Sequence, residues 1–219
     1  MWICSNCGAW LTATALDPTE SGMTIRCPDC GYRELFVQDP LWWVTGAPGS
    51  GKSSVLPHLR RALPEYVVFD GEAIDFWRFT EAAGDYAPLY DCWLKVGHQI
   101  ALNRRPLVIV ATALPEQLDA RPCRGYFSTI HYLGLICPAA EQERRLRARP
   151  AWRQADGGAF IPSAYGFTRR LRELAQDDPT TLTLHDTTAT TPQESAAAIA
   201  CWVRQSDYPP TTEAIQREL

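Results

Sequence analysis

The sequence has little lysine and no long apolar run. Its 219 residues include only two lysines, Lys52 and Lys95, against nineteen arginines. No apolar stretch approaches the roughly 20 residues that a membrane-spanning helix needs. The N-terminus also lacks a basic segment leading into an apolar one, so no secretory signal is recognisable. We therefore expect a cytoplasmic protein that does not associate with membranes.

The composition predicts a folded chain without general affinity for polyanions. Hydrophobic residues make up 46% of the chain and charged residues 21%, and the net charge is -4 at pH 7. These fractions are typical of globular proteins, and a negative chain is not attracted overall to nucleic acid or anionic lipid. The length suits one ordinary domain plus a small module. Nucleic acid is thus a disfavoured partner, though not an excluded one, and no feature indicates the oligomeric state.

The eight cysteines fall into two groups. Four are single, and we expect them to be small apolar filler. The other four form two Cys-x-x-Cys pairs separated by nineteen residues, and these are Cys4, Cys7, Cys27 and Cys30. Two such pairs let four thiolates reach one tetrahedral Zn²⁺, and each pair is followed by a glycine, which adopts positive φ readily. Two disulfides or four free thiols are the alternatives, and the first is unusual in a cytosolic chain.

Residues 1–38 resemble a zinc ribbon. A closed set of four cysteines leaves no open coordination position, so the metal should be structural rather than catalytic. Short strands are expected around residues 10–12 and 23–25, joined by a polar turn over residues 17–22. The segment contains two arginines against four acids, which is poor for contacts with phosphates. We therefore expect the ribbon to dock onto the main domain or onto a protein partner.

The second domain, residues 39–219, opens with an apolar run that leads into a glycine-rich loop. The loop matches Gly-x-x-x-x-Gly-Lys-Ser, the P-loop that binds the phosphates of a nucleoside triphosphate. Glycines let the amides converge on the phosphates, the lysine reaches the β- and γ-phosphates, and the Ser53 hydroxyl binds Mg²⁺. The predicted nucleotide-binding residues here are Gly46, Gly49, Ser50, Gly51, Lys52, Ser53 and Ser54. The expected cofactors are ATP, or another nucleoside triphosphate, and Mg²⁺.

Short apolar runs recur along this domain at the spacing of an α/β sheet. Strands are expected at residues 41–45, 66–69, 107–111, 132–136 and 181–184, and helices at 53–63, 86–102, 139–149, 168–175 and 192–205. Strands that are apolar on both sides suit a parallel sheet covered by helices on each face. We predict an α/β fold with a doubly wound five-stranded parallel sheet, ligands at the strand carboxyl ends, and a small N-terminal zinc ribbon.

Two acids follow the second expected strand, and either can serve phosphate transfer. Asp70 is our first choice and Glu72 the second, because a carboxylate at this edge can bind Mg²⁺ or take a proton from an acceptor hydroxyl. The alternative is that Asp70 only caps the next helix. The third expected strand runs into Thr112 without an acid.

These features together resemble the small P-loop kinases of the shikimate, gluconate and adenylate kinase group. The resemblance covers residues 39–205 and rests on the P-loop, the acid after the second strand and an arginine-rich stretch over residues 144–150. In that family a mobile lid follows the fourth strand, and its arginines fold over the transferred phosphoryl group. The resemblance implies lid arginines at Arg149 and Arg153. The glycine content of residues 153–167 is typical of a moving loop, and Lys52 and Asp70 join the two arginines as predicted catalytic residues. A solvated basic helix face is the alternative for the arginines.

The same resemblance places the adenine ring at the loop after the last strand. Thr187 and Thr188 are the predicted contacts there, with a cap for the helix from Pro192 as the alternative. The aromatic segment over residues 76–93 is the predicted acceptor site, with core packing as its alternative.

The leading functional hypothesis is an ATP- and Mg²⁺-dependent kinase that transfers the γ-phosphate to a small acceptor, with a nucleoside or nucleotide preferred. Two alternatives remain open. One is a polynucleotide 5'-hydroxyl kinase, and the other is a non-catalytic nucleotide-binding regulator that uses the ribbon to meet a partner.

Overall fold

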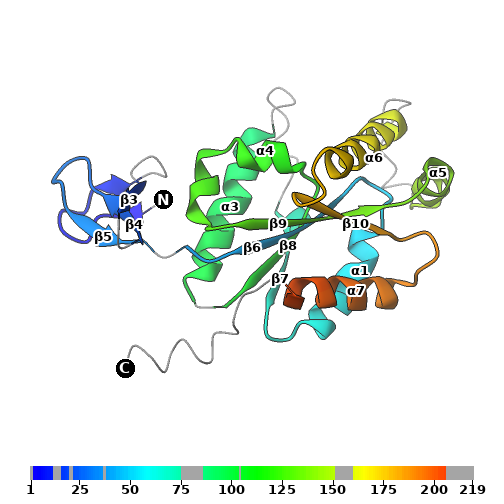
Figure 1. Cartoon of the computed structure of the whole chain (residues 1–219), viewed down its shortest axis with the longest axis horizontal. Coiled ribbons are helices and arrows are strands. Elements are labelled where there is room, and N and C mark those ends of the chain that lie inside the picture. Colours follow the sequence, from blue (N-terminus) through cyan, green and yellow to red (C-terminus); the bar gives the residue numbers. More distant parts are fainter. Residues whose placement is uncertain are drawn as a thin grey trace.

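A five-stranded parallel sheet forms the centre of the computed structural model (Figure 1). The model describes residues 2–11, 16–19, 22–36, 38–74, 86–103, 105–150 and 160–205. The strand order is β10-β9-β6-β8-β7, and every pairing is parallel. The strands are β6 (Leu41–Gly46), β7 (Val67–Asp70), β8 (Leu107–Val110), β9 (Ile130–Ile136) and β10 (Leu182–Asp186). The predicted α/β class and the five parallel strands are confirmed.

Helices cover both faces of this sheet (Figure 1). One face carries α1 (Lys52–Ala62) and α7 (Pro192–Gln205), and the other carries α3 (Ala87–Ala101), α4 (Pro115–Asp119) and α6 (Phe160–Asp177). The short helix α5 (Ala139–Arg147) lies beyond the carboxyl end of β9, and the 3₁₀ turns η2 (Gly71–Ala73) and η3 (Pro122–Tyr126) complete this domain. Within the described residues, no helix is both long and apolar enough to cross a membrane.

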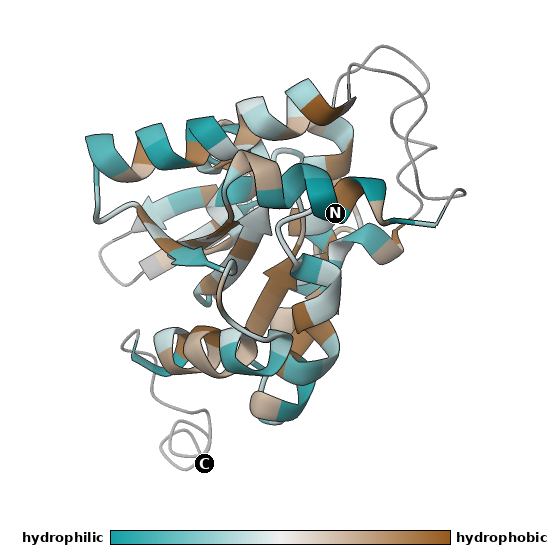
Figure 2. Cartoon of the chain, turned by 90° about the vertical axis from the view of Figure 1, so that its right-hand side faces the viewer, coloured by the Kyte–Doolittle hydropathy of each residue, from teal (hydrophilic) through white to brown (hydrophobic). Residues whose placement is uncertain are grey.

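The central strand β6 shows why the sheet needs two helical layers. Its side chains alternate between the faces, so Leu41 and Trp43 enter the core beneath α3 and α6, whereas Trp42 and Val44 enter the core beneath α1 and α7. All four are 0% exposed. Figure 2 shows the result, with largely apolar central strands between helices whose ribbons alternate between apolar and polar residues.

Helix α6 begins earlier than expected. Residues 160–167 belong to the predicted moving loop but are helical in the structure, so that part of the prediction is wrong. Ile161 and Ala164 recur at helical spacing and pack with Leu146 of α5. Pro162 is compatible with the helix because it lies in the first helical turn. Gly166 lies within the helix, and an added Cβ there would meet nothing within 4 Å. Residues 151–159 lie outside the described part of the chain, and with them the predicted lid residue Arg153.

The N-terminal segment forms two small antiparallel sheets rather than one hairpin. Strand β1 (Trp2–Ile3) pairs with β2 (Trp10–Leu11), and β4 (Gly22–Arg26) lies between β3 (Leu16–Thr19) and β5 (Arg33–Leu35). Asp17, Pro18 and Thr19, which we expected in a turn, therefore form an edge strand. Pro18 is compatible with that place because an edge strand tolerates a missing amide donor.

The ribbon packs directly against the main domain. Phe36, just after β5, stacks on His98 of α3 with ring centroids 4.9 Å apart, and it lies 5.7 Å from the Tyr126 ring of η3. The Gln38 side chain donates a hydrogen bond to the Gly125 carbonyl of η3. The predicted docking onto the main domain thus has a physical basis, while the predicted boundary between residues 38 and 39 stays a prediction.

Candidate nucleotide-binding site and four-cysteine cluster

The P-loop lies between β6 and α1, at the carboxyl edge of the sheet. Gly49 and Gly51 have φ values of +86° and +105°, which side chains rarely adopt. Gly46 is required for a different reason, because a Cβ there would lie 2.4 Å from the Ser50 Oγ and 2.8 Å from the Leu135 carbonyl oxygen. The loop is therefore shaped by close backbone approach as well as by positive φ.

The loop's carbonyl groups are captured by side chains from several elements. Lys52 and Thr112 donate to the Gly46 carbonyl at 2.6 Å and 3.2 Å. The Gln142 amide donates to the Pro48 carbonyl at 2.8 Å, and the Thr187 hydroxyl donates to the Ser50 carbonyl at 2.9 Å. Carbonyls that are turned outward leave the amides of the loop available for an anion.

Two features of the loop fit a bound phosphate. The Ser50 Oγ is buried and has no hydrogen-bond partner among the described residues. Within the same part of the chain, no group accepts from the amides of Gly49 and Gly51. The side chains of Ser53 and Ser54 lie exposed in the first turn of α1, where a hydroxyl can reach a metal ion. The residues present therefore suit the phosphates of a nucleotide and an accompanying Mg²⁺.

Lys52 is the charged centre of the site. It is only 5% exposed, and its Nζ lies 3.6 Å from the Glu72 Oε1. Burial lowers the pKa of the Lys52 ammonium, the Glu72 carboxylate acts in the opposite direction, and the nearby Arg149 lowers that pKa further. A buried cation with one partly exposed acid beside it is poised to accept additional negative charge.

The two candidate acids take different positions. The Asp70 carboxylate accepts a hydrogen bond from the Glu72 amide at 3.1 Å and so caps η2. The Glu72 carboxylate instead extends to Lys52. Asp70 therefore does cap η2, as the alternative predicted. The cap uses only one of the two carboxylate oxygens. No acid follows β8, where Thr112 contacts the P-loop as described above.

Arginines of α5 divide into a surface group and one that meets the P-loop. Arg144 and Arg147 pair with Glu141 and Glu143 on the helix surface, as the basic-face alternative predicts. Arg145 reaches inward, and its guanidinium donates to the Thr187 hydroxyl and carbonyl at 2.8 Å each. The sequence reasoning chose Arg149 and missed Arg145, although a helical repeat from Glu141 to Arg145 would have indicated a fixed guanidinium.

Thr187 and Thr188 have separate surroundings. Thr187 is 4% exposed, and its hydroxyl is already engaged by Ser50 and Arg145. Thr188 is exposed, and its amide donates to the Asp186 carboxylate at 2.8 Å. The helix cap that we gave as the alternative exists but belongs to Thr191, whose hydroxyl accepts from the Glu194 amide at 3.2 Å. Thr187 ties the last strand to the P-loop.

The predicted acceptor aromatics are mostly core residues where the structure describes them. Trp93 is 1% exposed and Tyr90 is 7% exposed, whereas Tyr86 is 37% exposed and stacks on Tyr90. The packing alternative therefore holds for Trp93 and Tyr90. The predicted aromatics at positions 76, 77 and 79 lie outside the described residues.

The fold of this chain is found in known structures. A sugar kinase from Janibacter aligns with a TM-score of 0.59 at 14% identity, covering 78% of this chain and 96% of that one. The chain has the fold of the small P-loop kinases. The tunicamycin resistance protein of Deinococcus radiodurans aligns with a TM-score of 0.56 at 21% identity over 79% of this chain and all (100%) of that one. A shikimate kinase from Acinetobacter baumannii aligns with a TM-score of 0.52 at 15% identity, covering 80% of this chain and 97% of that one. No protein-family model and no curated protein sequence matches the chain.

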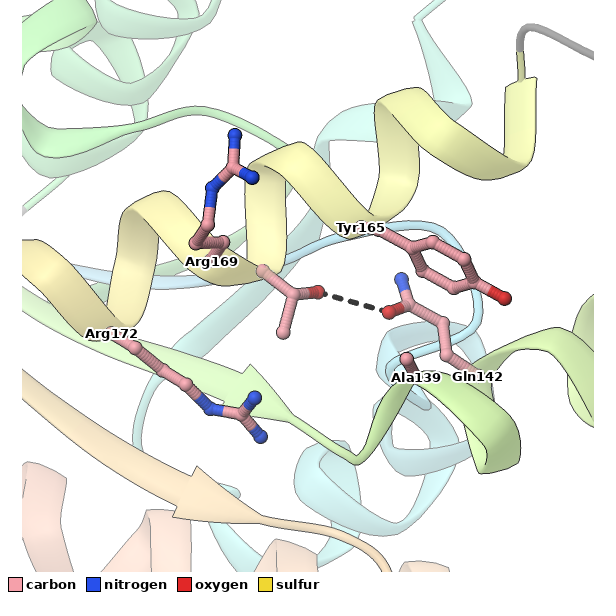
Figure 3. A pocket seen from close by; sticks show the side chains of 6 residues that line it. Ala139, Gln142, Tyr165, Arg169 and Arg172 are labelled. Atoms are coloured by element: carbon pink, nitrogen blue, oxygen red, sulfur yellow. Dashed lines mark hydrogen bonds between the residues drawn. The ribbon is translucent and has the colours of Figure 1, made fainter.

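Within this P-loop kinase fold, Gln142 is a residue that sequence reasoning missed. It is 1% exposed, and its amide nitrogen donates to the carbonyls of Pro48 in the loop and Ala164 in α6. Its amide oxygen accepts from the Thr168 hydroxyl at 3.1 Å (Figure 3). No motif marks this glutamine, because its role depends on where α5 meets α6.

A cleft of about 250 Å³ opens between α5 and α6 beside Gln142 (Figure 3). Its lining residues are Ala139, Gln142, Tyr165, Thr168, Arg169 and Arg172. None of them is a predicted nucleotide or acceptor residue. This cleft is therefore lined by residues other than those of the candidate phosphate site in the P-loop.

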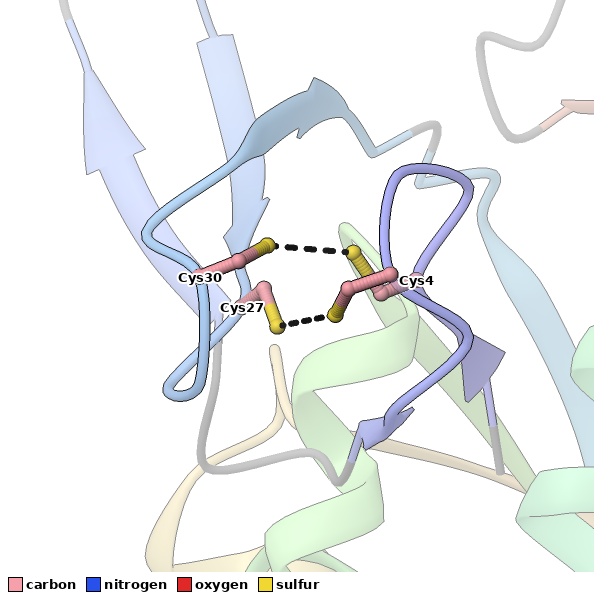
Figure 4. Close-up of side chains that lie close together, drawn as sticks. Cys4, Cys27 and Cys30 are labelled. Carbon is pink, nitrogen blue, oxygen red and sulfur yellow. Dashed lines mark hydrogen bonds between the residues drawn. The ribbon is translucent and has the colours of Figure 1, made fainter.

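The four predicted metal ligands of the ribbon come together in a cluster (Figure 4). The sulfur atoms of Cys4 and Cys30 lie 3.7 Å apart, those of Cys7 and Cys27 lie 3.6 Å apart, and all four lie within 4.8 Å of one another. A tetrahedral ion with bonds of about 2.3 Å to sulfur requires sulfur separations of roughly 3.8 Å. Disulfide bonds would be about 2.05 Å long, and all four cysteines are free.

Backbone geometry and hydrogen bonds prepare the cluster for a cation. Gly8 and Gly31 have φ values of +77° and +72°, and each donates its amide to the first cysteine carbonyl of its pair. A hydrogen bond from the Asn6 amide, with another from the backbone, lowers the pKa of the Cys30 thiol to about 6. The Ala9 backbone lowers the pKa of the Cys7 thiol, but burial and hydrogen bonds with the other three cysteines raise it to about 12. A thiol that ionises readily is a good ligand for a soft metal ion.

Proposed function

We propose that this protein is an ATP- and Mg²⁺-dependent kinase that transfers the γ-phosphate to a hydroxyl of a small acceptor, with nucleosides and nucleotides as the preferred class. One observation carries the proposal. The P-loop lysine and the acid-bearing turn after β7 converge at one edge of the sheet, with Lys52 Nζ 3.6 Å from Glu72. A triphosphate site with an acid alongside suits transfer of phosphate to a hydroxyl.

On the donor side, the loop amides and Lys52 bind the phosphates and neutralise their charge. Ser53 and Asp70 would hold Mg²⁺, which when bound offsets charge on the phosphate oxygens. Arg149 lies close enough to influence the charge of Lys52, and with Arg153 it is our proposed pair of arginines for the transferred group. Arg145 supports this side by fixing Thr187 against the loop.

On the acceptor side, Glu72 is the better placed of the two acids to take a proton. Asp70 uses one oxygen to cap η2, whereas the Glu72 side chain is 40% exposed and directed toward Lys52. A carboxylate beside the phosphate site can accept the proton that an attacking hydroxyl releases. We therefore assign Asp70 to the metal and Glu72 to the acceptor.

The four-cysteine cluster is proposed to hold a structural Zn²⁺. The support is that the four sulfur atoms lie within 4.8 Å of one another, with two of their separations, 3.7 Å and 3.6 Å, close to those around a tetrahedral ion. Four protein ligands leave no position for a substrate, so this ion would stabilise the ribbon rather than take part in transfer.

An acceptor screen that follows ADP production with ATP and Mg²⁺ tests the kinase proposal. The panel should contain nucleosides, nucleoside monophosphates, sugars and short oligonucleotides. Lys52→Ala should lower turnover of any accepted compound by about 10²–10³-fold while the fold persists. Lys95→Ala is the matched control, because Lys95 is exposed on α3 and removes the same charge.

Three results would redirect the assignment. Turnover restricted to oligonucleotides would favour the polynucleotide 5'-hydroxyl kinase. Tight ATP binding without transfer to any compound would favour the non-catalytic regulator. Full activity of Lys52→Ala would show that the P-loop does not serve catalysis.

A further inference from the structure

Helix α3 connects the four-cysteine ribbon with the acid-bearing turn. Two of its buried residues, Trp93 and His98, are 1% and 3% exposed. His98 meets the ribbon, and Trp93 meets the turn that carries Asp70 and Glu72. The helix thus spans two sites that are far apart in the sequence.

At the ribbon end, the contact is a packed group of three rings. Phe36 stacks on His98, and Tyr126 lies 4.9 Å from His98, measured between ring centroids. The buried cysteines Cys4 and Cys27 belong to the same continuous core as Phe36, Tyr126 and Trp93. A ribbon that loses its metal loses the support that holds Phe36 in this group.

At the other end of the contact path, Trp93 is hydrogen-bonded to the Asp70–Glu72 turn and packed closely against it. Its indole nitrogen donates to the Gly71 carbonyl at 2.8 Å, between Asp70 and Glu72. A Cβ on Gly71 would lie 2.6 Å from the Ala111 Cβ and 3.1 Å from the indole ring. The position of the turn therefore depends on the position of Trp93.

We propose that the metal-bound ribbon is a positioning element for the acceptor side of the site. Phe36 holds α3 through His98, and α3 holds the Asp70–Glu72 turn through Trp93. The assignment of this turn to the acceptor rests on the proposed kinase function, whereas the mechanical coupling does not. The P-loop is held separately by Thr112, Gln142 and Thr187, so nucleotide binding should not depend on the ribbon.

The coupling is tested by NMR on the full chain uniformly labelled with ¹⁵N, with the tryptophan indole signal of Trp93 as the main readout. The resonance of Trp93 is assigned with Trp93→Phe, and its hydrogen exchange is then measured in Phe36→Ala. Exchange should become faster by about tenfold or more, because the bond to Gly71 opens more often. Phe36→Tyr keeps a ring in the group and should restore most of the protection.

Trp10→Ala is the matched control within the ribbon, since Trp10 is 65% exposed. It should leave the Trp93 exchange unchanged. Backbone exchange at Ser50 and Val55 reports on the P-loop in every variant and should also stay unchanged. Unaltered Trp93 exchange in Phe36→Ala would overturn the proposal, and so would an equal loss of protection at the P-loop, which would make the ribbon a support for the whole domain.

A second arm removes the metal with a zinc chelator and then restores zinc. Removal should reproduce the Phe36→Ala effect on Trp93 with ADP affinity unchanged, and restoration should reverse it. Once an acceptor is found, Phe36→Ala should raise its KM about tenfold and leave the KM for ATP unaltered. If no acceptor is found, the kinase proposal fails while the indole exchange still decides the coupling. An unaltered acceptor KM despite faster exchange would overturn the positioning role alone.

Discussion

The P-loop and the four-cysteine ribbon are both built from glycine-containing turns, but they are held in place by different means. Lys52, Thr112, Gln142 and Thr187 bind the carbonyls of the P-loop from four separate parts of the chain. The ribbon has a much smaller set of fully buried apolar residues, chiefly Leu11 and Ile25 at 2% and 1% exposure, together with its cysteines.

The difference shows which interactions each site depends on. A loop with many protein partners keeps its shape because the whole fold supports it. A segment with a small core needs an added bond, and four thiolates around one ion supply it. The two sites should therefore respond to different perturbations.

Loss of a cluster cysteine should have the largest effect. Cys27→Ser should abolish the binding of one zinc per chain and remove hydrogen-exchange protection over the ribbon, since structural zinc sites contribute about 10 kcal/mol or more to small folds. Metal analysis and hydrogen exchange measure both. Cys201→Ser alters an exposed single cysteine and should keep the zinc. A zinc-replete Cys27→Ser protein would contradict the cluster assignment.

A substitution in the P-loop should have the next largest effect. Gly46→Ala introduces a Cβ at 2.4 Å from Ser50 Oγ, which we expect to destabilise the domain by about 2–3 kcal/mol and to weaken ADP binding about a hundredfold. Gly166→Ala is the control, because its Cβ enters open space in α6 and should stabilise by about 0.5–1 kcal/mol. Thermal unfolding and calorimetric titration of ADP check both. An unchanged ADP affinity in Gly46→Ala would mean that the loop adapts.

The junction between the two regions should be sensitive to acid. Burial lowers the pKa of His98 to about 4 from its ordinary 6.5, so the unfolded chain binds a proton before the folded one does. The contribution of neutral His98 to the free energy of unfolding is present in full above about pH 6.5, and it is lost as the pH falls toward about 4. Between about pH 7 and pH 5 we expect a loss of roughly 2 kcal/mol that His98→Phe lacks.

Denaturant titrations of both proteins at each pH measure this difference. The comparison with His98→Phe cancels the titration of every other group. Identical pH dependence in the two proteins would show that His98 is protonated as easily in the fold as outside it.

Among the four test substitutions, leaving the controls aside, Thr187→Val should have the smallest effect. It removes a buried hydroxyl that joins the Ser50 carbonyl to Arg145, at a cost of about 1–2 kcal/mol. Thr188→Val changes an exposed hydroxyl and should stay within about 0.5 kcal/mol. Urea unfolding separates the two, and equal effects would mean that Thr187 does not brace the loop.

Sequence reasoning succeeded where one local pattern has one structural solution. Continuous apolar runs predicted β6, β8 and β9 in a parallel sheet, and the spacing of four cysteines predicted their cluster. It failed where packing decides, as in residues 160–167, which belong to a segment whose glycine content suggested a moving loop. Ile161 and Ala164 find apolar partners across α5, and that burial outweighs the weak helix propensity of the segment.

By itself, the sequence determined the P-loop, the cysteine cluster and the α/β class, because each depends on residues close together in the chain or on a short repeat. Only the tertiary structure decided that Glu72 rather than Asp70 lies beside Lys52, that Arg145 and Gln142 brace the loop, and that Phe36 joins the ribbon to α3. These contacts connect residues that are 20 to 94 positions apart, as strand order and helix packing bring them together.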